Sequence, residues 1–480
     1  MKKHISLKKR LCFFLVFLLT GGNLVSQPID LQTAIVKAQL FLKQKGLRLE
    51  TDFINATPTA YSGFYILNSA DNQGFVIVSA EEHTVSVLGY SNKGTFDATR
   101  MPVHVRQWLD MYEQDIQAVR SGEISADADS PEYITSDGKN LSSVDPLINT
   151  RWDQGQYYNN LCPADAAFNS DEYLAGHVCT GCTNTAMAQV MKYWSWPVHG
   201  YGSHSFSWDN DPWTDWNYGT LSADFENTVY DWENMPEELT SSSTIEQVNA
   251  VSTLMYQCGV ANESFYNSYG DGSTGAYVLA SDLYPDYGYT HCAELSLVDY
   301  FGYKSTATGY SKRDFPTDTW TQMLKNEFIA GRPVIYQGES GGWDSYGHCF
   351  ILDGYDDQSR FHINWGWSGE YDGYYSLSAL KPDTYCDFSH NQGGIFFVEP
   401  EYATSITNQN IDNNNFINVY GCNRLIHVLS AEGQTVYVYD LVGKCLVEKT
   451  CTGGHFKIPV NQSGIYIVRI NKKIKKVIIN

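Results

Sequence analysis

The sequence has few basic residues for its length of 480: 32 Lys and Arg stand against 54 Asp and Glu, a formal net charge of −22. Nucleic-acid binding requires a basic face that neutralises phosphates, so the composition argues against nucleic acid as the main partner. Cysteine is sparse too, and the ten cysteines after Cys12 are too few for a disulfide scaffold in a chain this long. Beyond residue 30 no apolar run is long enough to span a membrane.

Aromatic residues, in contrast, are abundant. Hydrophobic residues make up 43% of the chain and aromatic residues 14%. A chain with this much apolar surface can bury a core, which excludes wholesale disorder. Because a single core tends to stop growing at about 250 to 300 residues, the length predicts two or three domains.

Residues 1–26 have the features of a signal peptide. Small or polar residues follow the apolar run 11–19, and five basic residues precede it: Lys2, Lys3, Lys8, Lys9 and Arg10. The alternative, a membrane anchor, would need ~20 apolar residues, about twice the run that is present. The pattern predicts a secreted protein, either released or attached to the outer cell surface by something other than a transmembrane helix.

Residues 27 to about 120 have the pattern of a small α+β domain. Apolar residues recur at helical spacing from Leu31 to Leu42, and Gly46 follows as a helix terminator. The other elements expected in this domain are strands at 63–67, 74–79 and 85–90 and a helix at 103–119.

Two polar segments, 121–143 and 403–415, predict linkers, the first of them exposed and cleavable. Between them, residues 144–400 are dense in Trp, Tyr and Gly, with a helical pattern at 183–194 and strand patterns farther on. Residues 416–480 carry short, regularly spaced strands that predict a small β-sandwich. The fold class expected for the whole chain is α+β.

Cys179 and Cys182 form a CxxC pair, which could be a redox dithiol or half of a zinc site. A structural zinc site would want a second close ligand pair, but the other cysteines are isolated. A redox dithiol would require an early βαβ unit, which this sequence lacks. A zinc deaminase would require a histidine followed two residues later by Glu, and no histidine here meets this condition. We therefore expect neither a metal nor a cofactor.

Cys182 alone fits a nucleophile. It stands at the start of the helix predicted at 183–194, where unpaired N–H groups and the helix dipole favour a thiolate. Gly181 lets the chain turn sharply and leaves room for a substrate backbone. The competing interpretation is a buried structural cysteine.

Residues 347–354 and 360–367 predict two strands joined by a polar turn. If His348 faces Asn364, the hairpin is centred at residue 356, and the amide can hold the imidazole in one tautomer as a general base. A slip of one residue would separate them. His362 is the rival base, but Gly347 leaves the approach to His348 open. Trp365 and Trp367 could shield the pair from water or simply pack the core.

In these stretches the sequence resembles the streptopain family of papain-like cysteine peptidases. The likeness spans about 144–400, and several motifs occur in family order: Trp152–Gly155, Thr180–Tyr193, Pro333–Gly338, Gly347–His348 and His362–Trp367. It implies a papain-like domain with a helical part and an antiparallel β part. It also implies specific roles: Cys182 as nucleophile, His348 as acid/base, Asn364 as its orienting partner, Gln154 as an oxyanion donor and Trp365 as a cover.

The flanking regions resemble parts of related precursors. Residues 27–140 are similar to the family's inhibitory propeptide, and residues 416–480 to type IX secretion sorting domains. The resemblance implies a zymogen whose partners are protein or peptide substrates, its own propeptide and the secretion machinery. Two alternatives are a papain-like acyltransferase such as a transglutaminase, which would normally carry Asp in place of Asn364, and a non-catalytic surface adhesin.

Overall fold

The computed structural model describes fifteen stretches of the chain. They are residues 28–47, 52–123, 143–208, 217–267, 270–283, 289–339, 347–378, 390–401, 418–422, 425–429, 433–440, 444–452, 455–460, 464–470 and 473–479. Three predicted segments lie outside these residues: the signal peptide, nearly all of the linker at 121–143 and the whole linker at 403–415.

The N-terminal unit pairs two helices with a small antiparallel sheet, as the sequence predicts. Its elements are α1 (Leu31–Gln44), β1 (Phe53–Asn55), β2 (Phe64–Ser69), β3 (Phe75–Ser79), β4 (Val87–Ser91) and α2 (Val103–Ser121). Helix α1 begins because the Asp30 carboxylate accepts the Thr33 N–H at 2.8 Å. It ends before Gly46, whose φ of +67° favours glycine. Its buried face, with Ala38 and Phe41, packs on the sheet.

The central unit has a helical part and a sheet part. The helical part holds α3 (Cys182–Trp194), α4 (Ile245–Ala261), α5 (Ala293–Asp299), the hairpins β5 (Ser203–Trp208)/β6 (Gly219–Asp224) and β7 (Phe265–Tyr266)/β8 (Thr274–Gly275), and 3₁₀ turns at Ala166–Phe168, Trp232–Asn234 and Ala280–Asp282. The sheet part holds β9 (Thr308–Ser311), the 3₁₀ turn Lys312–Asp314, α6 (Thr317–Ile329), β10 (Val334–Glu339), β11 (Gly347–Tyr355), β12 (Phe361–Asn364), β13 (Gly373–Tyr375) and β14 (His390–Phe396). The helix predicted after Cys182 is confirmed as α3.

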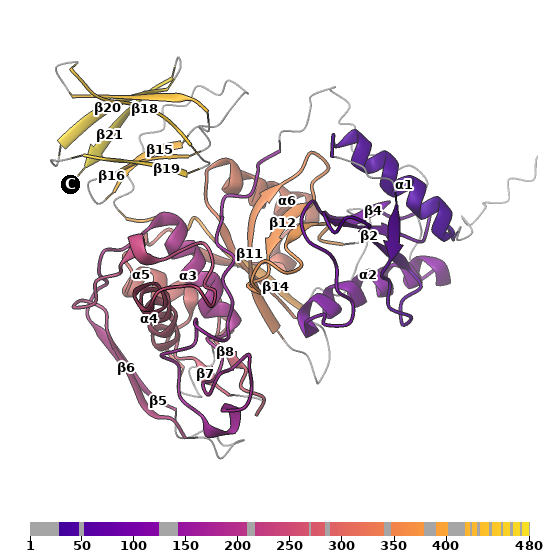
Figure 1. Ribbon diagram of the computed structural model, residues 1–480, viewed down its shortest axis with the longest axis horizontal. Coiled ribbons are helices and arrows are strands. Elements are labelled where there is room, and N and C mark those ends of the chain that lie inside the picture. The colour runs from indigo at the N-terminus through magenta and orange to yellow at the C-terminus, as the bar shows by residue number, and fades with distance from the viewer. Residues whose placement is uncertain are drawn as a thin grey trace, which may run out of the picture.

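One sheet joins the N-terminal and central units. Its ten described strands run in the order β1-β2-β3-β4-β13-β12-β11-β10-β14-β9, and β4 pairs with β13 through Tyr90↔Tyr374 and Gly89↔Tyr375. Helices α3, α4 and α5 lie on one side of the central strands, while α1 and α2 lie with the strands of the N-terminal unit (Figure 1). The chain is therefore α+β, with two units that share a backbone ladder.

Successive side chains of β11 point alternately into two different hydrophobic cores. Cys349 and Ile351 belong to the core built with α3 and α4. Phe350 and Leu352 belong to the core that includes Trp108 of α2 and part of α6. Successive residues at the start of β11 therefore lie in different surroundings.

The predicted register of the β11–β12 hairpin is wrong. Asn364 pairs with Ile351, not with His348, and the register shifts by one residue between Leu352 and Gly354. The turn is displaced because the Asp356 carboxylate accepts the N–H groups of Gln358 and Arg360, both at 2.9 Å, which places the loop beyond residue 356. His348 and Asn364 consequently point to opposite faces of the sheet.

The C-terminal strands form two small sheets, in agreement with the predicted β-sandwich. One has the order β15 (Asn418–Cys422), β16 (Leu425–Leu429), β19 (His455–Pro459). The other has the order β18 (Cys445–Thr450), β17 (Thr435–Tyr439), β20 (Gly464–Ile470), β21 (Lys473–Ile479). Ile426, Val438 and Val468 are buried in their common core.

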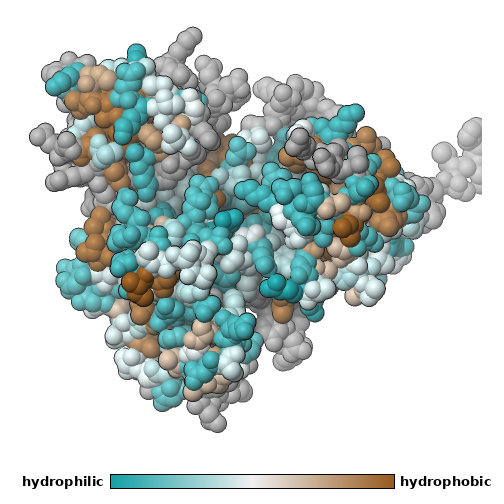
Figure 2. Space-filling view, viewed as in Figure 1, coloured by the Kyte–Doolittle hydropathy of each residue, from teal (hydrophilic) through white to brown (hydrophobic). Residues whose placement is uncertain are grey.

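No helix in the described part of the chain is long and apolar enough to cross a membrane. On the face shown in Figure 2, hydrophilic residues cover much of the centre of the molecule, and hydrophobic residues occur in separate small groups.

Candidate active site

Cys182 is the first residue of α3, and a strained glycine sets its position. Gly181 has φ +93° and ψ 143°, a combination essentially restricted to glycine. A Cβ there would lie 2.8 Å from the backbone oxygen of Thr274 in β8. Asn184 of α3 fixes the same turn, because its side-chain amide donates to Thr180 O and to Ser264 Oγ. The thiol is thus held at a helix N-terminus, where the sequence predicts it.

Burial dominates the electrostatics of this thiol. It raises the pKa of Cys182, and N–H groups of Cys349 and Thr183 offset the effect only in part. The Cys349 N–H donates to Sγ at 3.4 Å. The neutral thiol is therefore favoured over the thiolate that the helix dipole alone would predict.

His348 immediately precedes the residue that contacts this thiol, and its imidazole is buried among aromatic rings. Nε2 lies 3.1 Å from the backbone oxygen of Trp365. The Trp367 ring stacks on the imidazole with centroids 5.7 Å apart, and the Trp365 ring does so at 6.0 Å. Since a carbonyl can only accept, Nε2 must carry the proton of this hydrogen bond. In the neutral ring, the lone pair then sits on Nδ1, the nitrogen that can act as a base.

Asn364 has different partners from those expected. Its amide nitrogen donates to Thr150 O at 2.8 Å, and its Oδ1 accepts from Gln189 Nε2 and from the Gly366 N–H, both at 3.1 Å. These contacts tie β12 to α3 and to the segment before Trp152. They shape the chain around Trp365, whose carbonyl occupies the position expected for the Asn364 amide.

Gln154 lies beside the cysteine loop. Its backbone oxygen accepts the Thr180 N–H at 2.9 Å, and its side chain is only 6% exposed. No described residue accepts a hydrogen bond from its buried Nε2. An unpaired buried donor is costly in a folded protein. This amide is therefore available to a group that enters the site.

Trp365 connects several parts of the site. Its backbone N–H donates to the Asp372 carboxylate at 2.9 Å. Its ring packs edge to face against Trp108 of α2, with centroids 5.7 Å apart. Gly347 is the exposed first residue of β11 and pairs with Glu339. All seven predicted site residues thus lie in or next to α3, β11 and β12 or bond the turn before α3, but Asn364 bonds α3 and Thr150 in place of His348.

The rival base His362 has a separate environment. Its Nδ1 lies 2.6 Å from Asp353 Oδ1, and the other Asp353 oxygen accepts the Ile148 N–H at 2.8 Å. Burial lowers the pKa of His362, but the Asp353 charge outweighs this and raises it. His362 therefore belongs to a buried ion pair that anchors the start of the central unit.

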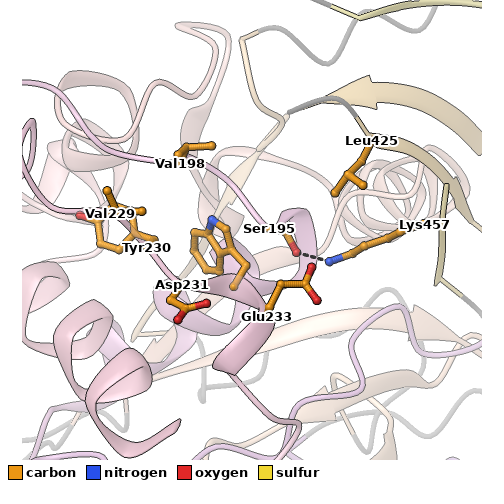
Figure 3. A pocket seen from close by; sticks show the side chains of 9 residues that line it. Ser195, Val198, Val229, Tyr230, Asp231, Glu233, Leu425 and Lys457 are labelled. Atoms are coloured by element: carbon orange, nitrogen blue, oxygen red, sulfur yellow. Dashed lines mark hydrogen bonds between the residues drawn. The ribbon is translucent and has the colours of Figure 1, made fainter. Parts of the chain in front are cut away.

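A pocket of about 410 Å³ lies elsewhere, between the central unit and the C-terminal sandwich. Lys457 of β19 reaches across it and donates to Ser195 Oγ at 2.6 Å, beside Glu233 (Figure 3). Ser195 ends α3 and Cys182 begins it, so the two are separated by a helix of about 20 Å. This pocket is not part of the cysteine site.

Comparisons with known proteins converge on one family. The profile described as the peptidase C10 family matches residues 152–375, and that of the Spi protease inhibitor matches residues 26–116. A solved fragment of prointerpain A from Prevotella intermedia, a Cys→Ala mutant, is 30% identical with a TM-score of 0.58; the match covers 72% of this chain and 98% of that one. The chain belongs to the peptidase C10 family.

Two curated relatives support this membership. The thiol protease/hemagglutinin PrtT of Porphyromonas gingivalis is 31% identical over 72% of this chain, which spans only 37% of that protein. Streptopain of Streptococcus pyogenes is 28% identical over 67% of this chain and 75% of its own length. The names of these relatives make C10 a family of cysteine peptidases, and the predicted family and α+β fold are confirmed.

Sequence reasoning missed three residues that support the cysteine site or the neighbouring His362. Gln189 of α3 accepts the Trp152 backbone N–H at 3.2 Å and donates to Asn364. Asp372 accepts the backbone N–H of Trp365. Asp353 pairs with His362. Gln189 lies within a motif stretch but has no chemical mark of its own. The two aspartates stand next to strand segments rich in aromatic residues, where an acidic side chain needs a specific partner.

Gly181→Ala is expected to lower the free energy of unfolding by about 1–3 kcal/mol, because the backbone conformation is strained for alanine and the new Cβ meets Thr274. Gly202→Ala is the matched control, since Gly202 also has a positive φ but nothing within 4 Å of its Cβ position. Thermal unfolding of both variants checks this. Equal losses in the two would contradict the proposed crowding at Cys182.

Burial raises the pKa of Asp372 from its ordinary value of 3.8 to about 7. The folded state therefore keeps a proton that the unfolded state has released, and this group destabilises the fold as the pH rises through that window. Asp372→Asn, which can still accept from Trp365, is expected to gain stability relative to the parent from pH 4 to pH 7, by up to about 1.4 kcal/mol per pH unit. Denaturant unfolding across this range measures it; a difference independent of pH would contradict the assignment.

Proposed function

We propose that this chain is the zymogen of a secreted cysteine endopeptidase that cleaves extracellular proteins. The observation that carries the proposal is the junction of α3 and β11: Cys182 Sγ, at a helix N-terminus, accepts the N–H of Cys349, and the preceding residue, His348, has its Nε2 held by the Trp365 carbonyl. In this proposal the other ring nitrogen of His348, Nδ1, is the base for the thiol. Membership of the C10 family supports the same chemistry.

In the proposed reaction, Nδ1 of His348 takes the proton of Cys182, and the thiolate attacks the carbonyl carbon of a peptide bond. The oxyanion that forms accepts hydrogen bonds from Gln154 Nε2 and from the backbone N–H of Cys182. The imidazolium then returns the proton to the leaving amine, which leaves an acyl-enzyme. Water, deprotonated by the same imidazole, releases the acid product. Trp365 and Trp367 keep solvent from the hydrogen bond that orients His348.

The N-terminal unit acts as the inhibitory propeptide in this proposal. Trp108 is fully buried against Phe350 and Trp365, the residues whose rings also contact His348. Arg360 of the central unit donates to Val87 O at 2.9 Å and lies over the Phe41 ring of α1. Together with the β4–β13 ladder, these contacts hold the unit on the site until the chain is cut within residues 121–143.

The ends of the chain complete the proposal. Residues 1–26 direct export, and residues 416–480 engage the secretion machinery as a sorting domain, after which the enzyme is released or stays on the outer surface. A substrate of protein or peptide nature follows from the peptidase chemistry, and no cofactor takes part in the reaction.

Removing the oxyanion donor is expected to slow turnover with little effect on the fold. Gln154→Ala should lower kcat/KM for a peptide substrate by about 10²- to 10³-fold, whereas Cys182→Ala should abolish it. Labelling of Cys182 by an iodoacetamide probe should be lost in Cys182→Ala and persist in Gln154→Ala. Cleavage of casein by the Cys182→Ala protein would contradict the peptidase assignment, and efficient transfer of the acyl group to added amines in place of hydrolysis would favour an acyltransferase.

Loosening the propeptide contact is expected to expose the site. Trp108→Ala removes a large side chain from the core at Trp365, at a cost of about 3–5 kcal/mol. The uncut precursor should then label at Cys182 at least tenfold faster. Tyr65→Phe is the control, because its hydroxyl bonds Ile29 O within the same unit. Equal labelling rates in the Trp108→Ala variant and the parent would show that this contact does not block the site.

A further inference from the structure

Two histidines and a glutamate meet in the helical part of the central unit, apart from the cysteine site. His204 lies on β5, Glu263 follows α4, and His291 stands just before α5. His204 Nε2 is 3.1 Å and His291 Nδ1 is 3.6 Å from Glu263 Oε1. One ligand atom from each of the three residues lies within 4.8 Å of the other two.

We propose that His204, Glu263 and His291 bind one divalent transition-metal ion of the Zn²⁺ class. Nitrogen and carboxylate ligands about 2.0–2.2 Å from a tetrahedral ion lie roughly 3.3–3.6 Å from one another. The two distances to Glu263 Oε1 match this spacing after shifts of a few tenths of an ångström. Three protein ligands leave one coordination position for water.

The carboxylate is already in place for such an ion. Glu263 has φ +50°, unusual for a residue other than glycine, and its Oε2 accepts the N–H groups of Thr290 at 2.6 Å and His291 at 3.2 Å. These bonds hold Oε1 toward the histidines. Oε1 also accepts the Thr290 hydroxyl, at 2.8 Å.

The histidines are supported as metal ligands usually are. Thr290 Oγ1 lies 2.8 Å from Nδ1 of His291, a contact that an ion at Nδ1 would replace. Tyr300 OH lies 3.0 Å from Nε2 of the same ring and holds it in orientation. Asp299 Oδ2, 4.0 Å from the same nitrogen, adds negative charge. The rings of His204 and His291 are only 4.9 Å apart, so two imidazolium ions here would repel each other. A metal ion would coordinate both imidazole rings in their neutral form, and its positive charge would attract the Glu263 carboxylate.

The ion would join three segments that are distant in sequence. It would tie the β5–β6 hairpin to the chain between α4 and β7 and to the start of α5. Strand β7 pairs with β8, where the Thr274 hydroxyl donates to Cys179 O at 2.7 Å, next to the cysteine turn. The site is thus expected to stabilise the helical part, independently of whether the enzyme function proposed above holds.

The test uses the full chain with Cys182→Ala, which removes the nucleophilic thiol as a competing ligand. After treatment with a chelator, Zn²⁺ is added and binding is followed by calorimetry and by thermal unfolding. One ion per chain should bind, and Tm should rise, because ligand binding to the folded state adds RT ln(1 + [L]/Kd) to its stability. No rise in Tm and no binding would overturn the proposal.

His204→Phe and His291→Phe keep the ring contacts with Tyr300 but lose the ligand nitrogen. Each should lose at least tenfold in affinity and most of the Tm shift. His199→Ala, at an exposed histidine outside the cluster, is the control and should behave as the parent. Unchanged affinity in both Phe variants would contradict the assignment.

If either Phe variant fails to fold, the visible absorption spectrum of the parent loaded with Co²⁺ shows which ligands bind the ion. Ligation by nitrogen and oxygen gives weak visible bands without a thiolate charge-transfer band. A strong sulfur-to-cobalt band would place the ion on the cysteines and overturn the site.

Discussion

The contact between His348 Nε2 and the Trp365 carbonyl organises the cysteine site. It fixes which imidazole nitrogen carries the proton, and it ties β11 to the turn that follows β12. The turn is held in place by Asp372 on the Trp365 N–H and by Asn364, which reaches the Gly366 N–H and α3 through Gln189. A backbone carbonyl is a suitable anchor for an imidazole because it accepts hydrogen bonds only and cannot rotate.

The same tryptophan links the site to the N-terminal unit. Trp108 packs against the Trp365 ring, and the β4–β13 ladder makes the two units one continuous sheet. In this state burial favours a neutral thiol at Cys182. In the propeptide role proposed above, removal of this unit would release the rings of Phe350 and Trp365, which contact His348, from Trp108.

Much of this arrangement could be predicted from the sequence. The helix after Cys182, the strands of both flanking units and the α+β class follow from apolar periodicity and from glycine and polar turns. The observed register, in which Asn364 pairs with Ile351 and not with His348, could not be predicted, because the Asp356 carboxylate moves the turn and the extra residue near Asp353 shifts the ladder. A carbonyl partner also leaves no trace in the sequence, since every residue has one. The meeting of His204, Glu263 and His291 depends on one strand and two connecting segments that tertiary packing brings together.

The tautomer of His348 tests the central claim most directly. In ¹⁵N-histidine-labelled Cys182→Ala protein, with His348→Gln used to assign the signals, ¹⁵N chemical shifts distinguish a protonated from an unprotonated ring nitrogen. The structure predicts that Nε2 of His348 carries a proton, because this nitrogen lies 3.1 Å from the Trp365 carbonyl oxygen. A neutral ring protonated on Nδ1 would contradict the account, because the Trp365 carbonyl could not then orient the base.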